Sequence, residues 1–245
     1  MIPTLLLVPG LASDSECWRP QIDALTGAAQ VSVVDLKTCR SRREMADAVL
    51  ADAPPRFILA GNSMGGWVAQ EVAARAPDRV TSLILIATWT RPDPAFNSKQ
   101  REGIEEIREG RFEEVMRDHA RSILHPKFQN DRALLKALFD MQDRIGPETV
   151  ARHIQAMIDS YETTSLLPEI VAPTLVIAGR QDPLFSVEEH AFIARQVARG
   201  RLAIVEESGH VVQMEQPSAA TALMRYWIEY GGLDAGAPTP FHTTG

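Results

Sequence analysis

The chain is organised around the segment Phe57-Ile58-Leu59-Ala60-Gly61-Asn62-Ser63-Met64-Gly65-Gly66-Trp67-Val68-Ala69. It starts as a short apolar strand, turns sharply at a serine and continues with residues typical of a helix. Residues 61–65 fit the pattern G-x-S-x-G, in which a serine occupies the apex of a tight strand-to-helix turn. The two glycines stand where a Cβ would clash with neighbouring backbone. The pattern predicts that Ser63 is a nucleophile at the carboxyl edge of a sheet. The alternative is a glycine-rich turn that only packs a helix on a sheet.

Apolar runs of four to eight residues alternate with helical segments on both sides of this turn. The runs at residues 4–8, 30–34, 57–60 and 80–87 are nearly continuous, which is typical of strands buried on both faces. The same rhythm resumes later, with strands at 173–178 and 202–205 and helices at 187–197 and 217–230. This alternation predicts an α/β fold with a mostly parallel sheet and helices on both faces.

Between residues 90 and 168 the chain shows helical periodicity only. We expect one helix through Ile104 to Met116, a second around Leu134 to Met141 and a third that begins at Pro147. We therefore predict an inserted helical cap at 90–168 and an α/β core formed by residues 1–89 and 169–230. The remaining residues, 231–245, are rich in Gly, Pro and Thr, and we predict a flexible C-terminal tail.

Composition narrows the classes of partner and the compartment. The 245 residues carry a net charge of −7 and no basic run, which argues against binding to nucleic acid or to an anionic membrane surface. No apolar run has transmembrane length, no signal peptide is recognisable, and two cysteines do not make a disulfide framework. We expect a cytoplasmic protein with reduced thiols. No metal-binding or phosphate-binding motif is present, so we expect neither a metal nor another cofactor.

A serine hydroxyl needs a base, and histidine is the usual one because its pKa lies near the working pH. Of the six histidines, His210 follows a predicted sheet strand and lies on the edge where Ser63 should point. Asp182 stands in the same relation to the strand that ends at Ala178, and a carboxylate there would hold the imidazole in one tautomer. Asp93 is the second candidate for the acid. The order Ser63, Asp182, His210 is the order of the α/β-hydrolase triad.

With these residues in place, residues 4–230 resemble the α/β-hydrolase-fold serine hydrolases of the capped carboxylesterase and enol-lactonase kind. The resemblance implies an oxyanion hole made by the backbone N–H of Met64, directly after the serine, and of Leu11, after the first strand. Leu11 lies in Pro9-Gly10-Leu11, which has proline where the family usually has histidine. The chain also lacks the Asp-x-x-Gly-x-Gly segment that many relatives carry after the second strand.

The resemblance implies a hydrolase of small carboxylic esters or lactones that acts through an acyl-enzyme on Ser63. Two alternatives stay open: a hydrolase of C–C bonds with the same triad, and a ligand-sensing protein with very slow turnover. Dehalogenases and epoxide hydrolases of this fold are disfavoured, because they need aspartate where Ser63 stands. Trp89 follows a strand on the same edge, where it either lines the acyl pocket or packs in the core or cap.

Overall fold

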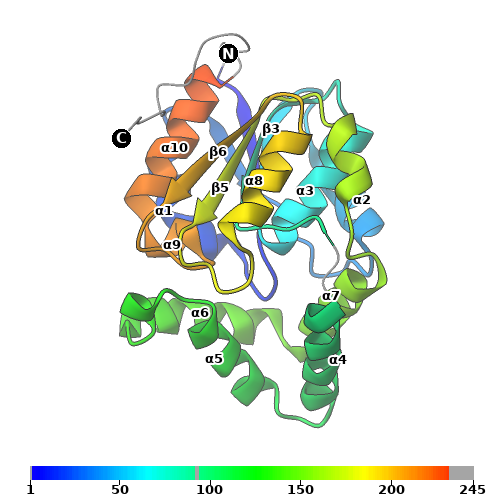
Figure 1. Cartoon of the computed structure of the whole chain (residues 1–245), viewed down its shortest axis with the longest axis vertical. Coiled ribbons are helices and arrows are strands. Elements are labelled where there is room, and N and C mark those ends of the chain that lie inside the picture. The colour runs from blue at the N-terminus through cyan, green and yellow to red at the C-terminus, as the bar shows by residue number, and fades with distance from the viewer. Residues whose placement is uncertain (1, 92–93, 232–245) are drawn as a thin grey trace.

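A six-stranded parallel sheet forms the centre of the computed structural model, which describes residues 2–91 and 94–231 (Figure 1). The strand order is β2-β1-β3-β4-β5-β6, and every neighbouring pair is parallel. The strands are β1 (Thr4–Val8), β2 (Gln30–Val33), β3 (Phe57–Asn62), β4 (Val80–Ile86), β5 (Thr174–Gly179) and β6 (Gly200–Val205). The predicted fold class is confirmed.

Helices cover both faces of this sheet because its central strands present apolar side chains to both sides. Leu6 and Leu59 point into one core and Leu5 and Ile58 into the other. The first core lies under α2 (Arg42–Asp52), α3 (Met64–Arg75) and α8 (Val187–Gln196). The second lies under α1 (Arg19–Leu25), which follows the 3-10 turn Ser15–Trp18, and under α10 (Pro217–Tyr230).

The edge strand β2 differs from our expectation. A strand buried on both faces was predicted at residues 30–34, but the side chains of β2 alternate between exposed and half-buried. The reason is its position, since β2 pairs only with β1 and its other edge is open. Apolar composition alone does not distinguish an edge strand from a central one.

The helical segment after β4 lies beyond the carboxyl ends of the strands (Figure 1). It contains α4 (Pro94–Arg108), α5 (Phe112–Ser122), α6 (Arg132–Ile145) and α7 (Pro147–Asp159), with short 3-10 turns at Pro126–Phe128 and Thr164–Glu169. The prediction of one helix through Ile104 to Met116 is wrong. Gly110 adopts φ +87, a conformation that L side chains rarely reach, and the chain breaks there into α4 and α5.

Two anchors fasten this helical segment to the sheet. At its start, the buried carboxylate of Glu189 accepts the backbone N–H groups of Thr90 (3.0 Å) and Arg91 (3.1 Å). At its end, Nη1 of Arg42 donates to the carbonyls of Ser160 (2.7 Å) and Glu162 (2.9 Å). Both ends of the segment are therefore held at fixed points of the α/β core.

The sequence also led to predictions about the cysteines, about membrane-spanning segments and about the C-terminal tail. The two cysteines, Cys17 and Cys39, are buried free thiols. None of the helices within the described ranges is long and apolar enough to cross a membrane. The predicted flexible tail begins at Gly231, and residues 232–245 lie outside the described part of the chain.

Candidate active site

Ser63 occupies the turn between β3 and α3 in a conformation that few side chains adopt. Its φ of 53° and ψ of −118° fall outside the regions favoured by L-residues. The turn is held from both sides: the backbone N–H of Ser63 donates to the carbonyl of Ile86 (2.9 Å), and its carbonyl accepts the hydroxyl of Thr88 (2.9 Å). Backbone strain fixed by surrounding hydrogen bonds is a feature of functional sites.

The flanking glycines explain why the chain can turn so tightly. A Cβ on Gly65 would lie 2.7 Å from the carbonyl oxygen of Pro9 and still closer to that of Val8. A Cβ on Gly61 would lie 2.6 Å from the backbone nitrogen of Gly66. Real Cβ atoms essentially never come this close to backbone atoms, so only glycine fits both positions. The pattern G-x-S-x-G therefore reflects steric necessity here.

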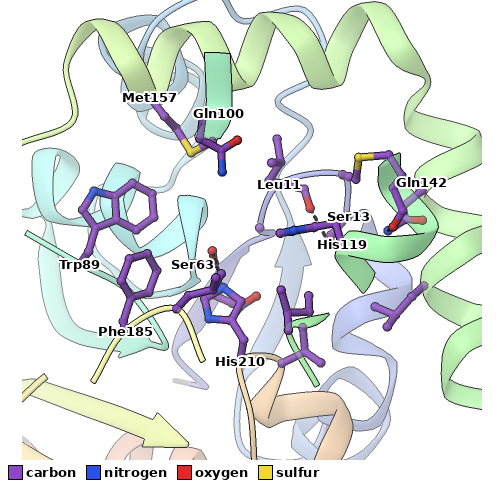
Figure 2. A pocket seen from close by; sticks show the side chains of 18 residues that line it. Leu11, Ser13, Ser63, Trp89, Gln100, His119, Gln142, Met157, Phe185 and His210 are labelled. Atoms are coloured by element: carbon purple, nitrogen blue, oxygen red, sulfur yellow. Dashed lines mark hydrogen bonds between the residues drawn. The ribbon is translucent and has the colours of Figure 1, made fainter. Parts of the chain in front are cut away.

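The structure brings Ser63, His210 and Asp182 together, although they are far apart in the sequence. Figure 2 shows the side chains of Ser63 and His210 beside one another. Nε2 of His210 lies 2.8 Å from Oγ of Ser63, and Nδ1 lies 2.9 Å from Oδ2 of Asp182. A carboxylate only accepts hydrogen bonds, so Nδ1 carries the proton and Nε2 is left to accept the serine hydroxyl. The imidazole is thus oriented as a base toward Ser63. The second acid candidate, Asp93, lies outside the described residues.

Asp182 is held in its ionised form. Burial by itself raises the pKa of this carboxyl, but the charge and hydrogen bond of His210 and the backbone N–H of Leu184 outweigh it and leave the pKa below its ordinary value. The side chains of His210 and Asp182 are 4% and 1% exposed, so water does not screen this pair. A buried carboxylate next to imidazole stabilises the imidazolium that forms when histidine takes up a proton.

Glu215 holds the backbone around His210, and sequence reasoning did not single it out. Its buried carboxylate accepts the backbone N–H of Gly209 (2.9 Å), of Val211 (3.1 Å) and of His125 (2.9 Å). Gly209 and Val211 flank His210, and His125 follows α5. Burial raises the pKa of Glu215 despite these three hydrogen bonds. The only signal in the sequence was an acidic residue five positions after His210, in the short helix α9 (Val212–Glu215).

The two predicted oxyanion donors belong to segments that adjoin Ser63. Met64 is the first residue of α3, and N–H groups in the first turn of a helix have no acceptor within it. The segment around Leu11 packs against the serine, since a Cβ on Gly10 would lie 3.4 Å from the Cβ of Ser63. A cavity next to Ser63 is lined in part by Leu11, whereas the side chain of Met64 is buried and is not part of this lining.

An aromatic wall borders the cavity on one side (Figure 2). Trp89 lines the cavity and stacks on Phe185 and Tyr161, with ring centroids 5.1 and 5.2 Å apart. Phe185 in turn lies 5.5 Å from the ring of His210. Trp89 also packs in the core, where it is almost fully buried and its indole N–H donates to the carbonyl of Tyr161 (3.1 Å). The two expectations for Trp89 are therefore compatible.

Three polar side chains from the helical segment line the same cavity: Gln100, His119 and Gln142. Helical periodicity did not identify them, because it does not say which face of these helices meets the sheet. Within residues 2–91 and 94–231, no three or more His, Cys, Asp or Glu side chains are grouped so as to hold a metal ion.

Comparison with known proteins adds an independent line of evidence. Residues 5–222 match the sequence profile of the alpha/beta hydrolase family. A pimeloyl-[acyl-carrier protein] methyl ester esterase of Vibrio atlanticus is 27% identical over 237 residues, which cover 89% of this chain and 91% of the relative. A protein of Rhizobium rhizogenes provisionally named carbamate hydrolase RutD is 26% identical over 231 residues, covering 87% of this chain and 88% of that protein.

The fold is also shared with solved structures. The enol-lactonase of Burkholderia xenovorans superimposes with a TM-score of 0.84 and 20% sequence identity, covering 94% of this chain and 92% of that one. At this level of identity the likeness concerns the fold alone. Together with the family match, it spans both parts of the sheet and the helical segment between them.

Proposed function

Because this chain belongs to the alpha/beta hydrolase family, we propose that it is a serine hydrolase that cleaves small carboxylic esters or lactones through an acyl-enzyme on Ser63. The observation that carries the proposal is the pair of hydrogen bonds of His210, at 2.8 Å to Ser63 and 2.9 Å to Asp182. The Vibrio relative supports the choice of ester among acyl substrates, since its name describes a methyl ester esterase.

The proposed reaction has two halves. Oγ of Ser63 attacks the carbonyl carbon while its proton passes to Nε2 of His210, and Asp182 stabilises the imidazolium. The backbone N–H groups of Leu11 and Met64 donate to the oxyanion, each contributing about 3 kcal/mol to the barrier reduction. The C–O bond of the ester then breaks, and His210 gives the proton to the leaving alcohol.

Water completes the cycle. It attacks the acyl carbon as His210 removes its proton, the bond to Oγ breaks, and the proton returns to Ser63 with release of the carboxylic acid. We further propose that residues 90–168 act as a cap over this site and that residues 1–89 and 169–230 form the catalytic core. The cavity supports this division, because its lining combines Ser63 and His210 of the core with Gln100, Met116 and Met157 of the helical segment.

An ester panel tests the proposal. We would measure the hydrolysis of 4-nitrophenyl esters of graded acyl length, of a γ-lactone and of an aryl carbamate by the wild-type protein, by Ser63→Ala and by Ser218→Ala. The control serine is exposed on α10 and is not among the residues that line the cavity. Sustained turnover of short esters or lactones that falls at least about 1,000-fold in Ser63→Ala, but not in Ser218→Ala, supports the proposal.

Other outcomes point to the alternatives. One acyl release followed by near-silence favours a ligand-sensing protein, and activity on a β-diketone without activity on esters favours a C–C bond hydrolase. A preference for the carbamate would favour the activity that the name of the Rhizobium relative describes, which is carbamate hydrolysis. Turnover that is undiminished in Ser63→Ala would refute the role of Ser63.

A further inference from the structure

The cavity beside Ser63 has two chemically different sides. Trp89 and Phe185 form the aromatic side, whereas His119 and Gln142 lie on the opposite side in the view of Figure 2. None of the described residues that line the cavity is Lys, Arg, Asp or Glu. The cavity therefore offers uncharged hydrogen-bonding groups. A purely apolar substrate would make no use of these groups.

Gln142 presents an acceptor that nothing in the described chain satisfies. Its side chain is buried, with 5% of the residue exposed, and Nε2 donates to the carbonyl of Met116 at 3.0 Å. Because that carbonyl can only accept, the amide nitrogen must face it, and this fixes the orientation of the amide. Oε1 is left buried without a hydrogen-bond partner among the described residues. A buried acceptor of this kind needs a donor, from water or from a ligand.

His119 lies in the same wall of the cavity and is neutral. Burial lowers its pKa to about 4, and the charges of His210 and Lys99 act in the same direction. A neutral imidazole has one N–H donor and one acceptor nitrogen. No hydrogen bond joins its ring nitrogens to another described residue, and the side chain of His119 lines the cavity.

We propose that Gln142 and His119 are specificity-determining residues that bind an uncharged hydrogen-bond donor of the substrate, such as a hydroxyl group. This inference rests on the proposed ester hydrolysis at Ser63. A hydroxyl donates to Oε1 of Gln142 and exchanges a second hydrogen bond with His119. A carboxylate would turn acceptor oxygens toward Oε1, and an alkyl group would leave Oε1 without a partner.

Matched esters test this directly. The first set consists of 4-nitrophenyl ω-hydroxyalkanoates of three to six carbons, their analogues with a terminal methyl in place of the hydroxyl, and their analogues with a terminal carboxylate. The second set carries the hydroxyl on the alcohol, as in 2-hydroxyethyl against propyl esters. For each pair we would measure the ratio of kcat/KM for the hydroxyl ester to kcat/KM for the methyl ester. The ratio is insensitive to the fraction of folded enzyme, since both rates share it.

The variants are Gln142→Met, which keeps the length of the side chain and removes the acceptor, and Gln129→Met as control. Gln129 also donates from Nε2 to a backbone carbonyl of the helical segment, that of Leu124 (3.3 Å), but it is not among the lining residues. For one chain length in one of the two sets, we expect a ratio of about 10 or more in wild type and in Gln129→Met. For the same pair of esters we expect a ratio near 1 in Gln142→Met.

Three results would overturn the inference: a ratio of 1 or less in both sets, a ratio that persists in Gln142→Met, or a preference for the carboxylate ester. Each of them, obtained with turnover that depends on Ser63, leaves the proposed hydrolysis intact. If no ester or lactone is hydrolysed in a way that depends on Ser63, the proposed function itself is refuted.

Discussion

The carboxylate of Glu215 accepts the backbone N–H of Gly209 at 2.9 Å and thereby holds the residue directly before His210. Its other oxygen accepts the N–H of Val211, directly after His210. The buried side chain of Glu215 thus holds the loop of His210 by hydrogen bonds to the residue before the histidine and to the residue after it. Since the same carboxylate also accepts the N–H of His125, the position of His210 is linked to the helical segment beyond the carboxyl ends of the strands.

Replacing Glu215 with glutamine should weaken the hydrogen bonds that hold the loop of His210. The amide has one acceptor oxygen in place of two, and its NH2 group would face backbone donors. We expect Glu215→Gln to lose about 2 kcal/mol in the free energy of unfolding, measured by urea denaturation, and at least about tenfold in kcat/KM on an aryl ester. The control is Glu207→Gln, whose exposed carboxylate pairs with Lys127 and should leave kcat/KM unchanged. Equal stability of Glu215→Gln and wild type would contradict the role of Glu215.

Two glycine-to-alanine changes should have opposite effects. In Gly65→Ala the new methyl group would collide with the carbonyl oxygens of Val8 and Pro9, which also displaces the loop that carries Leu11. We expect a loss of about 1–3 kcal/mol in unfolding free energy, together with a loss of ester hydrolysis. Gly103 lies inside α4 with nothing within 4 Å of an added Cβ, so Gly103→Ala should gain about 1 kcal/mol. Thermal or chemical denaturation of both variants measures the difference, and a tolerated Gly65→Ala would argue against the packing described here.

These cases separate what the sequence predicts from what it does not. The convergence of Ser63, Asp182 and His210 was predictable because each follows a strand of a parallel sheet, and the carboxyl ends of such strands share one edge. Glu215 and Gln142 were not, because their roles depend on how a loop and a helical segment meet the core. The break at Gly110 escaped prediction for a related reason, since helical periodicity continues across a turn that a single glycine makes possible.

His153 makes the stability of the fold dependent on pH. Burial lowers its pKa from 6.5 to about 4, against the effect of the hydrogen bond between its Nε2 and the carbonyl of Leu36 (3.0 Å). Folding therefore favours the neutral ring, and its stabilising contribution is present above pH 6.5 and declines as the pH falls toward 4. Between pH 7 and pH 5 this single group should lower the free energy of unfolding by about 2 kcal/mol.

The variant His153→Gln isolates this effect, because an amide can still donate to the carbonyl of Leu36. We expect its unfolding free energy to fall by about 2 kcal/mol less than that of wild type between pH 7 and pH 5, in urea denaturation at both pH values. His119 remains in both proteins, so its own contribution cancels from the comparison. The same pH dependence in wild type and His153→Gln would show that His153 is not the group responsible.

Activation of Ser63 by His210 is the central step of the proposed reaction, and a serine-directed probe reports it without any assumption about the substrate. A fluorophosphonate should label wild-type protein at Ser63, located by peptide mass spectrometry, and the rate should fall about 100-fold or more in His210→Ala, since the base is lost. Labelling of Ser63 at the same rate in His210→Ala and wild type would contradict the account.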